Sequence, residues 1–266
     1  MTKIVVCGIA GRMGQRLAHL SLAADDLDLV GGKEHPAHEV VGRDIGEIIG
    51  TQRLNIEIRD TLSGILEPDR VVVNFTTPEA TLEDAALCAE RGTAMVVGTT
   101  GFTPEQLDEF KRTVANITCV FASNFSTAMN VLFKLVEETA RILGDDYDVE
   151  VVEAHHRHKV DAPSGSALTL AERAAAGLAR NLREVVVHGR QGVVGERTRQ
   201  EIGIHAIRAG DLAGEHRVLY AAPGEYIELK HHATSRDSFA LGALRAVRFA
   251  AGAEPGLYSM GDVLGL

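Results

Sequence analysis

The residues best suited to chemistry lie in one short stretch, EAHHRHKVDAPSGSA (153–167). Histidine titrates near neutral pH, so His155 is a candidate for proton transfer. Ser164 precedes an alanine-rich segment with helical spacing and can cap that helix, whose first N–H groups attract anions. The stretch therefore predicts a pocket for a carboxylate-bearing ligand. The groups that this hypothesis places in the pocket beside His155 are His156, Lys159, Ser164, Gly165 and Ser166.

Two other interpretations of this stretch are a metal site and a solvated strand end. If the preceding residues are extended, His155 and His156 point to opposite faces, which makes joint ligation of one ion awkward. Lys159 would also place a second cation beside the metal. We therefore expect no metal. A solvated, charged strand end is the alternative that stays open.

A glycine-rich turn, GIAGRMG (8–14), follows the first apolar run. Such a turn lets the backbone approach a diphosphate at a helix N-terminus. Glu34 follows the second expected strand, where a carboxylate can accept from both ribose hydroxyls of an adenosine. Arg12, Lys33 and His35 could instead meet a 2′-phosphate, so either NADH or NADPH fits this pattern.

Further ligand contacts are expected where other strands of the same sheet end. The turns GTTG (98–101) and ASNF (122–125) follow two such strands and should line the same crevice as the glycine turn. The stretch NFTTPEA (74–80) is another strand end. There we expect Thr77 to cap the helix that begins at Pro78.

The order of the elements predicts an α/β protein with two domains. Through residue 126, β-branched runs alternate with helical patterns, which is typical of a Rossmann-like doubly wound parallel sheet. A long helix is expected over 127–144, and beyond it strands joined by a hairpin turn at 223–225 indicate a second, α+β domain with a mixed sheet. The expected strands are 3–9, 27–34, 55–60, 70–76, 94–100, 118–123, 148–156, 202–210 and 216–234, and the other expected helices are 12–24, 78–92, 104–115, 164–180 and 236–252.

Composition restricts the class of partner. A net charge of −10 argues against broad binding to nucleic acid or to an anionic membrane. The chain has 3 cysteines, which are far apart and read as buried apolar positions, not as a disulfide framework. No apolar run reaches the length of a membrane-spanning helix, so we expect a soluble, cytoplasmic protein.

Taken together, these motifs resemble the 4-hydroxy-tetrahydrodipicolinate reductase family, formerly called dihydrodipicolinate reductases. The likeness covers nearly the whole chain. It implies NADH- or NADPH-dependent reduction of the cyclic product of a preceding synthase to tetrahydrodipicolinate, on the route to diaminopimelate and lysine. The motifs that carry the resemblance are GIAGRMG, GTTGF, ASNFS, EAHHRHKVDAPSGSA, RQGVVGERTRQEIGIHAIRAGDLAGEHRVLY and ELKHHATSRDSFALGAL.

The resemblance also implies residue roles and domain limits. It makes His155 the proton donor and Lys159 its catalytic partner, with a dicarboxylate substrate on the neighbouring groups named above. It implies a dinucleotide-binding domain at 1–126, completed by about 237–266. A substrate-binding domain at 127–236 would assemble a homotetramer. The implied cofactor contacts are Gly8, Ile9, Ala10, Gly11, Arg12, Met13, Glu34, Gly98, Thr99, Thr100, Ala122, Ser123, Asn124 and Phe125.

Two positions depart from the family pattern, and two other classes of protein share parts of it. Ser166 stands where threonine is usual, and His35 where some relatives have arginine. A semialdehyde-type dehydrogenase would need a nucleophilic cysteine, which the apolar surroundings of the three cysteines disfavour. A sensor that binds NAD and a dicarboxylate without turnover is the other alternative.

Overall fold

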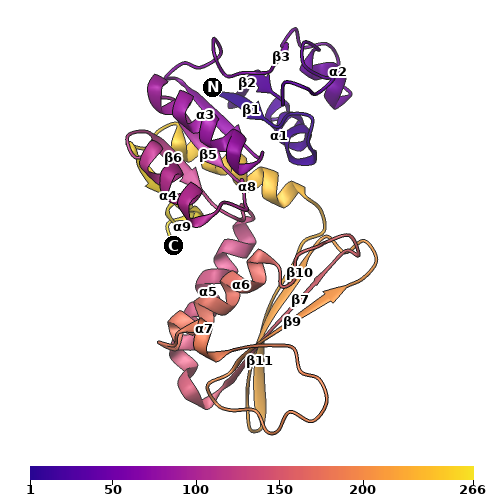
Figure 1. Cartoon of the computed structure of the whole chain (residues 1–266), viewed down its shortest axis with the longest axis vertical. Helices are drawn as coiled ribbons and strands as arrows, with labels where there is room; N and C mark the ends of the chain where they lie inside the picture. The colour runs from indigo at the N-terminus through magenta and orange to yellow at the C-terminus, as the bar shows by residue number, and fades with distance from the viewer. The chain divides into compact units, whose positions relative to one another are not determined.

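Seven parallel strands form the first sheet of the structure, a computed structural model that describes residues 1–266 (Figure 1). The strands are β1 (Thr2–Cys7), β2 (Leu27–Lys33), β3 (Ile58–Arg59), β4 (Arg70–Asn74), β5 (Ala94–Val97), β6 (Thr118–Phe121) and β12 (Gly256–Tyr258). Their order across the sheet is β12-β6-β5-β4-β1-β2-β3. The order reverses between β1 and β4, so the carboxyl ends of these two strands mark the expected ligand crevice.

Helices cover both faces of this sheet because the alternating side chains of its strands are apolar on both sides. Ile4 and Val6 pack in one core with α1 and α8, whereas Val5 and Cys7 pack in a second core with α3 and α4. This confirms the predicted doubly wound arrangement. The helices of this part are α1 (Arg12–Leu22), α2 (Ile45–Ile49), α3 (Pro78–Arg91), α4 (Pro104–Thr113), α8 (Asp237–Ala250) and α9 (Met260–Leu264).

The sequence-based prediction is wrong in two segments of the first sheet. The strand expected over 55–60 is reduced to β3, because Asn55 has a φ of 59° and the carboxylate of Asp44 accepts the N–H groups of Leu54 and Ile56 at 2.8 and 2.9 Å. These bonds replace the ladder of a strand. The C-terminal tail, to which the sequence pattern assigns no element, forms β12 and α9.

The second sheet has five strands and is mixed, as predicted. Its strands are β7 (Asp148–His155), β8 (Val186–His188), β9 (Ile202–Arg208), β10 (Glu215–Ala222) and β11 (Glu225–His232), in the order β11-β10-β7-β9-β8. β7, β8 and β9 run parallel, and β10 is antiparallel to both β7 and β11. The expected turn at 223–225 closes the hairpin between β10 and β11, with Gly224 at a φ of 91°.

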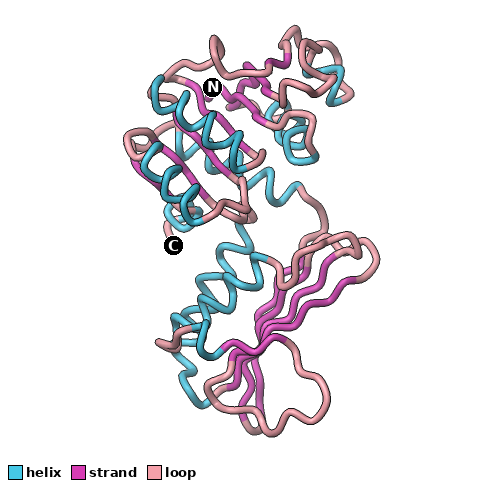
Figure 2. Tube along the Cα trace, viewed as in Figure 1, coloured by secondary structure: helices cyan, strands magenta, loops and turns pink.

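Helices lie along only one face of the second sheet (Figure 2). Val151, Val218 and Tyr220 point toward α5 (Thr127–Leu143) and α6 (Gly165–Gly177) and are buried there. The hydroxyl of Tyr220 donates to the carbonyl of Val136 at 2.7 Å, which ties the sheet to α5. The short helices η1 (Gly144–Asp146) and α7 (Leu182–Val185) complete this part of the chain.

The chain divides into two structural units. Unit 1 contains Met1–Thr127 and Arg236–Gly265, and unit 2 contains Ala128–Ser235 with Leu266. Unit 1 has the two apolar cores described above, and unit 2 has a core of its own. All three cysteines are buried in unit 1, as predicted. No helix of the structure has the length and apolar character needed to cross a membrane.

Candidate active site

The glycine turn in unit 1 forms a tight backbone cradle at the carboxyl end of β1. Gly8 has a φ of 74°, and the N–H of Gly11 donates to the carbonyl of Gly8 at 3.0 Å. A Cβ atom at Gly14 would lie 2.1 Å from the same carbonyl oxygen, so only glycine fits there. No side chain caps the N-terminus of α1, so its first N–H groups can face an anion. The turn therefore fits the diphosphate of a dinucleotide.

A cavity of about 610 Å³ opens beside this turn. Of the predicted cofactor contacts, Gly8, Ala10, Gly11 and Glu34 line it. The carboxylate of Glu34 accepts the N–H of Ala10 at 2.9 Å, so it lies at the turn itself. The cavity is also lined by Lys33, His35, Pro36, His38, Asp60, Phe75, Thr76, Thr77, Glu79, Ala80 and Glu83.

The side chain of Lys33, which lines the cavity, is bonded to a buried residue of the fold. Its ammonium group forms a close hydrogen bond and ion pair with Asp84, whose side chain is 0% exposed. Burial lowers the pKa of Lys33, but the bond and charge of Asp84 more than offset this, so the pKa is raised. Asn74 donates its amide to the other oxygen of Asp84 at 2.8 Å. The Lys33 ammonium is thus engaged within the fold.

The remaining predicted cofactor contacts do not line this cavity. Ile9 is fully buried, Arg12 is exposed and Met13 packs against the core. The segments 98–100 and 122–125 follow β5 and β6 at the same edge of the sheet.

Two residues of these segments use their side chains inside the fold. The hydroxyl of Thr99 lies 2.7 Å from that of Thr81, and the ring of Phe125 packs 5.5 Å from that of Phe75. Because the side chains of Thr99 and Phe125 are engaged in this way, these two residues can offer a ligand only their main-chain atoms. Thr77 caps α3 as predicted, accepting from Ala80 N at 3.4 Å, and also lines the cavity.

In unit 2, His155 ends β7 and its side chain is only 11% exposed. Its Nδ1 lies 2.5 Å from a carboxylate oxygen of Glu153. Burial lowers the pKa of His155, and the bond and charge of Glu153 partly oppose this. The protonated imidazole is therefore a stronger acid than that of an ordinary histidine.

Lys159 and His156 lie in the loop that follows β7. The N–H of Lys159 donates to the carbonyl of His156 at 3.1 Å, which closes a turn. The Lys159 ammonium pairs with Asp161 at 2.9 Å and keeps 22% of its side chain exposed. Nδ1 of His156 is buried and has no hydrogen-bond partner within the chain. Both side chains thus retain capacity for a polar ligand.

The N-terminus of α6 completes the site in unit 2. Ser164 caps the helix as predicted, accepting from Ala167 N at 3.2 Å. Gly165 begins the helix and is exposed. Nε2 of His216 lies 2.9 Å from the Ser164 hydroxyl, so this side chain is shared between the helix and a second imidazole. The structure therefore brings the whole 155–166 group into one region of unit 2.

Sequence reasoning missed three residues of this region: Glu153, Arg208 and His216. Glu153 could have been found, because it precedes His155 by two positions on a strand and so shares its face. Arg208 and His216 come from β9 and β10, and no local pattern connects them with His155.

Comparison with known proteins decides the family. The pattern described as "Dihydrodipicolinate reductase, N-terminus" matches residues 2–125, and "Dihydrodipicolinate reductase, C-terminus" matches residues 128–264. The chain belongs to the dihydrodipicolinate reductase family. Membership makes it an oxidoreductase with a Rossmann-type domain for a nicotinamide cofactor.

Full-length relatives agree with this family assignment. The chain is 49% identical over 266 residues to the 4-hydroxy-tetrahydrodipicolinate reductase of Syntrophobacter fumaroxidans, with 100% of both chains covered. It is 49% identical over 265 residues to that of Alkalilimnicola ehrlichii, covering 100% of this chain and 99% of the relative. A solved structure, the dipicolinate-bound dihydrodipicolinate reductase from Paenisporosarcina sp. TG-14, superposes with a TM-score of 0.72 at 25% identity over 97% of each chain.

Proposed function

We propose that this chain carries out the reaction of its family, the reduction of 4-hydroxy-tetrahydrodipicolinate to tetrahydrodipicolinate, with His155 as proton donor. The substrate gains a hydride and a proton and loses its hydroxyl group as water. A bound nicotinamide supplies the hydride. His155, in its protonated form, then protonates the neighbouring, electron-rich carbon. The single observation that carries this proposal is the family match along both halves of the chain.

The substrate is a dicarboxylate, so its site needs cations and N–H donors. We assign these to Lys159, His156 and the N-terminus of α6 at residues 164–166, all within one region of unit 2. The solved relative from Paenisporosarcina holds dipicolinate, which is itself a dicarboxylate. Unit 1 would hold the dinucleotide on the cradle and cavity described above.

A turnover assay tests this function. Purified protein is mixed with reduced nicotinamide cofactor and freshly made product of the preceding synthase, and cofactor absorbance is followed. The proposal predicts oxidation of the cofactor that depends on both the synthase product and the protein. Binding of both ligands without oxidation would instead identify the chain as a sensor.

The cavity of unit 1 supports a preference for NADH over NADPH. Three carboxylates besides Glu34 line it, from Asp60, Glu79 and Glu83, while the Lys33 ammonium is engaged with buried Asp84. A 2′-phosphate would bring a charge near −2 among these carboxylates. At about 1 kcal/mol for each unit-charge contact in water, we expect kcat/KM for NADH to exceed that for NADPH by ~10-fold or more.

We also propose a homotetramer assembled through the helix-free face of the unit 2 sheet. Leu219, Ile207 and Tyr226 project from this face, and Ile207 and Tyr226 are 48% and 71% exposed. Light scattering after size-exclusion chromatography should give a tetramer, and Leu219→Glu should dissociate it. A cytoplasmic location stays a prediction.

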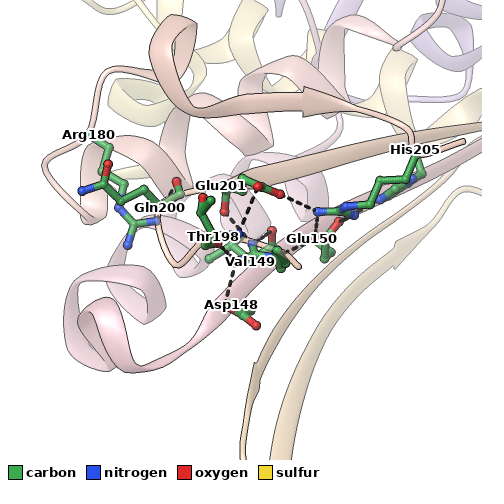
Figure 3. A network of polar contacts seen from close by, with 10 residues as sticks. Asp148, Val149, Glu150, Arg180, Thr198, Gln200, Glu201 and His205 are labelled. Atoms are coloured by element: carbon green, nitrogen blue, oxygen red, sulfur yellow. Dashed lines mark hydrogen bonds and ion pairs between the residues drawn. The ribbon is translucent and has the colours of Figure 1, made fainter. Parts of the chain in front are cut away.

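A polar network on the same face supports this assembly by fixing the loop between β8 and β9 (Figure 3). The carboxylate of Glu150 accepts from Arg190 at 2.8 Å, Arg197 at 3.0 Å and His205 at 2.7 Å. Burial raises the pKa of Glu150, but these bonds outweigh it and lower the pKa to about 2. The loop is thereby tied to the sheet at neutral pH and offers a preformed surface.

A further inference from the structure

Glu153 is a fully buried carboxylate beside the proposed proton donor, and the mechanism above does not use it. Its side chain is 0% exposed. Both terminal nitrogens of Arg208 donate to it at 2.8 Å, the N–H of Ser164 at 3.0 Å, and Nδ1 of His155 lies 2.5 Å away. Burial raises the pKa of Glu153, but the bonds from Arg208, His155 and Ser164 outweigh it, so the pKa is lowered. The group is ionised at neutral pH and can only accept hydrogen bonds.

We propose that Glu153 is a positioning residue for the reduction: by accepting the Nδ1–H of His155 it selects Nε2 as the nitrogen that delivers the proton. Arg208 pairs with Glu153, and its positive charge therefore limits how strongly the carboxylate stabilises the protonated ring of His155. This inference rests on the proposed role of His155. When the proton leaves Nε2 for the substrate carbon, the neutral ring keeps its Nδ1–H and its bond to Glu153, and solvent later restores the proton.

The surroundings of Nε2 agree with this assignment. The backbone of Gly214 lies on that side, and a Cβ atom added there would lie 3.1 Å from Nε2 of His155. Glycine there leaves Nε2 uncrowded, and a φ of 150° also disfavours a side chain. Nδ1, in contrast, is occupied by Glu153. Only Nε2 can therefore meet a ligand.

The second imidazole cannot replace His155 as the donor. His216 packs edge-on against His155 with ring centroids 5.0 Å apart. Burial, then the charge of His155, lowers the pKa of His216 to about 3, so it stays neutral wherever the enzyme works. Its Nε2 is bonded to Ser164. His216 is thus a neutral side chain that packs against His155 and restrains the orientation of its ring.

The charges around His155 predict opposite effects for the two members of the Glu153–Arg208 pair. Glu153 favours the protonated ring, whereas Arg208 and Lys159 disfavour it. Removing Glu153 should therefore lower the pKa of His155. Removing Arg208 deletes a cation and frees the full charge of Glu153, so it should raise the same pKa. The titratable and charged groups near His155 are Glu153 on β7, Arg208 on β9, His216 on β10, and Lys159 and Asp161 in the loop after β7.

The tautomer of His155 can be measured in the unaltered enzyme. Two-bond ¹H–¹⁵N spectra of ¹⁵N-histidine-labelled protein, with His155→Gln to assign the signals, report which nitrogen carries hydrogen above the pKa of the ring. We expect Nδ1–H. An Nε2–H tautomer would overturn the role of Glu153, and this readout does not depend on turnover.

The pH dependence of kcat is the second test, because a proton donor is active only when protonated. Glu153→Gln should move the descending alkaline limb to lower pH and Arg208→Met should move it to higher pH, each by ~1 pH unit or more. Arg208→Lys keeps the charge and should leave the limb near its wild-type position. In the double variant Glu153→Gln/Arg208→Met, the alkaline limb should return toward its wild-type position. Shifts of the same sign in both single variants, or none, would contradict the proposal.

Failure of this inference can be told from failure of the proposed function. If His155→Gln retains wild-type turnover, the proton-donor role is wrong whatever the tautomer. If His155→Gln loses turnover but Glu153→Gln leaves the pH profile and kcat unchanged, only the role of Glu153 is wrong. Far-ultraviolet circular dichroism and urea unfolding serve as the check that each variant is folded, because all of these positions lie in unit 2.

Discussion

The buried pair of Lys33 and Asp84 gives the most quantitative prediction. Lys33→Met removes the cation and leaves the Asp84 carboxylate, 0% exposed, with Asn74 and the thiol of Cys7 as its remaining side-chain hydrogen-bond donors. Breaking a buried ion pair by removing one partner costs about 3–5 kcal/mol. In a domain of this size each kcal/mol corresponds to roughly 2–4 °C, so the Tm of unit 1 should fall by ~6–20 °C.

The loss of stability in the Lys33→Met variant should depend on pH. Burial already raises the pKa of Asp84, against the opposing bond from Lys33. Without Lys33 the pKa rises further, so the folded state binds a proton that the unfolded state releases. A folded carboxyl with a raised pKa gains stability as pH falls. The difference in unfolding free energy between Lys33→Met and wild type should therefore shrink between pH 7 and pH 5.

Urea unfolding followed by far-ultraviolet circular dichroism measures these free energies, and NADH binding assigns the transition to unit 1. The control is Lys33→Met/Asp84→Asn, which removes both charges and should recover most of the loss, because a neutral replacement of a buried pair is often tolerated. A Lys33→Met variant within ~1 kcal/mol of wild type, or an equal loss at both pH values, would refute the reasoning.

Three further variants test the site. His155→Gln should lower kcat by ~10²- to 10⁴-fold with an unchanged Kd for NADH, and near-normal turnover would remove His155 from its role. Lys159→Ala should raise KM for the substrate and lower kcat, since its cation serves both binding and reaction; steady-state constants equal to wild type would exclude it. Glu34→Gln keeps an acceptor for Ala10 N but removes one charge beside the cavity, so the ratio of kcat/KM for NADPH to that for NADH should rise several-fold to ~10-fold. A constant ratio would mean that Glu34 does not discriminate.

Much of the fold could be predicted because its elements follow from contacts between near neighbours in the chain. The run of β-branched residues in β1, the cap at Ser164 and the turn before β11 each depend on a few adjacent positions. The short elements α2, β8 and β12 could not be predicted, since a strand of three residues carries little periodicity. They are held by hydrogen bonds to a neighbouring strand or to an anchor such as Asp44.

The sequence by itself determined which chemical groups are available: the glycine turn, Glu34, His155, Lys159 and the helix start at Ser164. Only the tertiary structure decided how these groups are used. It engages Lys33 with Asp84, 51 residues away, and it joins Glu153 to Arg208, 55 residues away, so that a buried carboxylate faces one nitrogen of His155. Such pairs depend on the register between β7 and β9 and on packing of α3 against the sheet. No local pattern encodes that register, because it results from the packing of the whole unit.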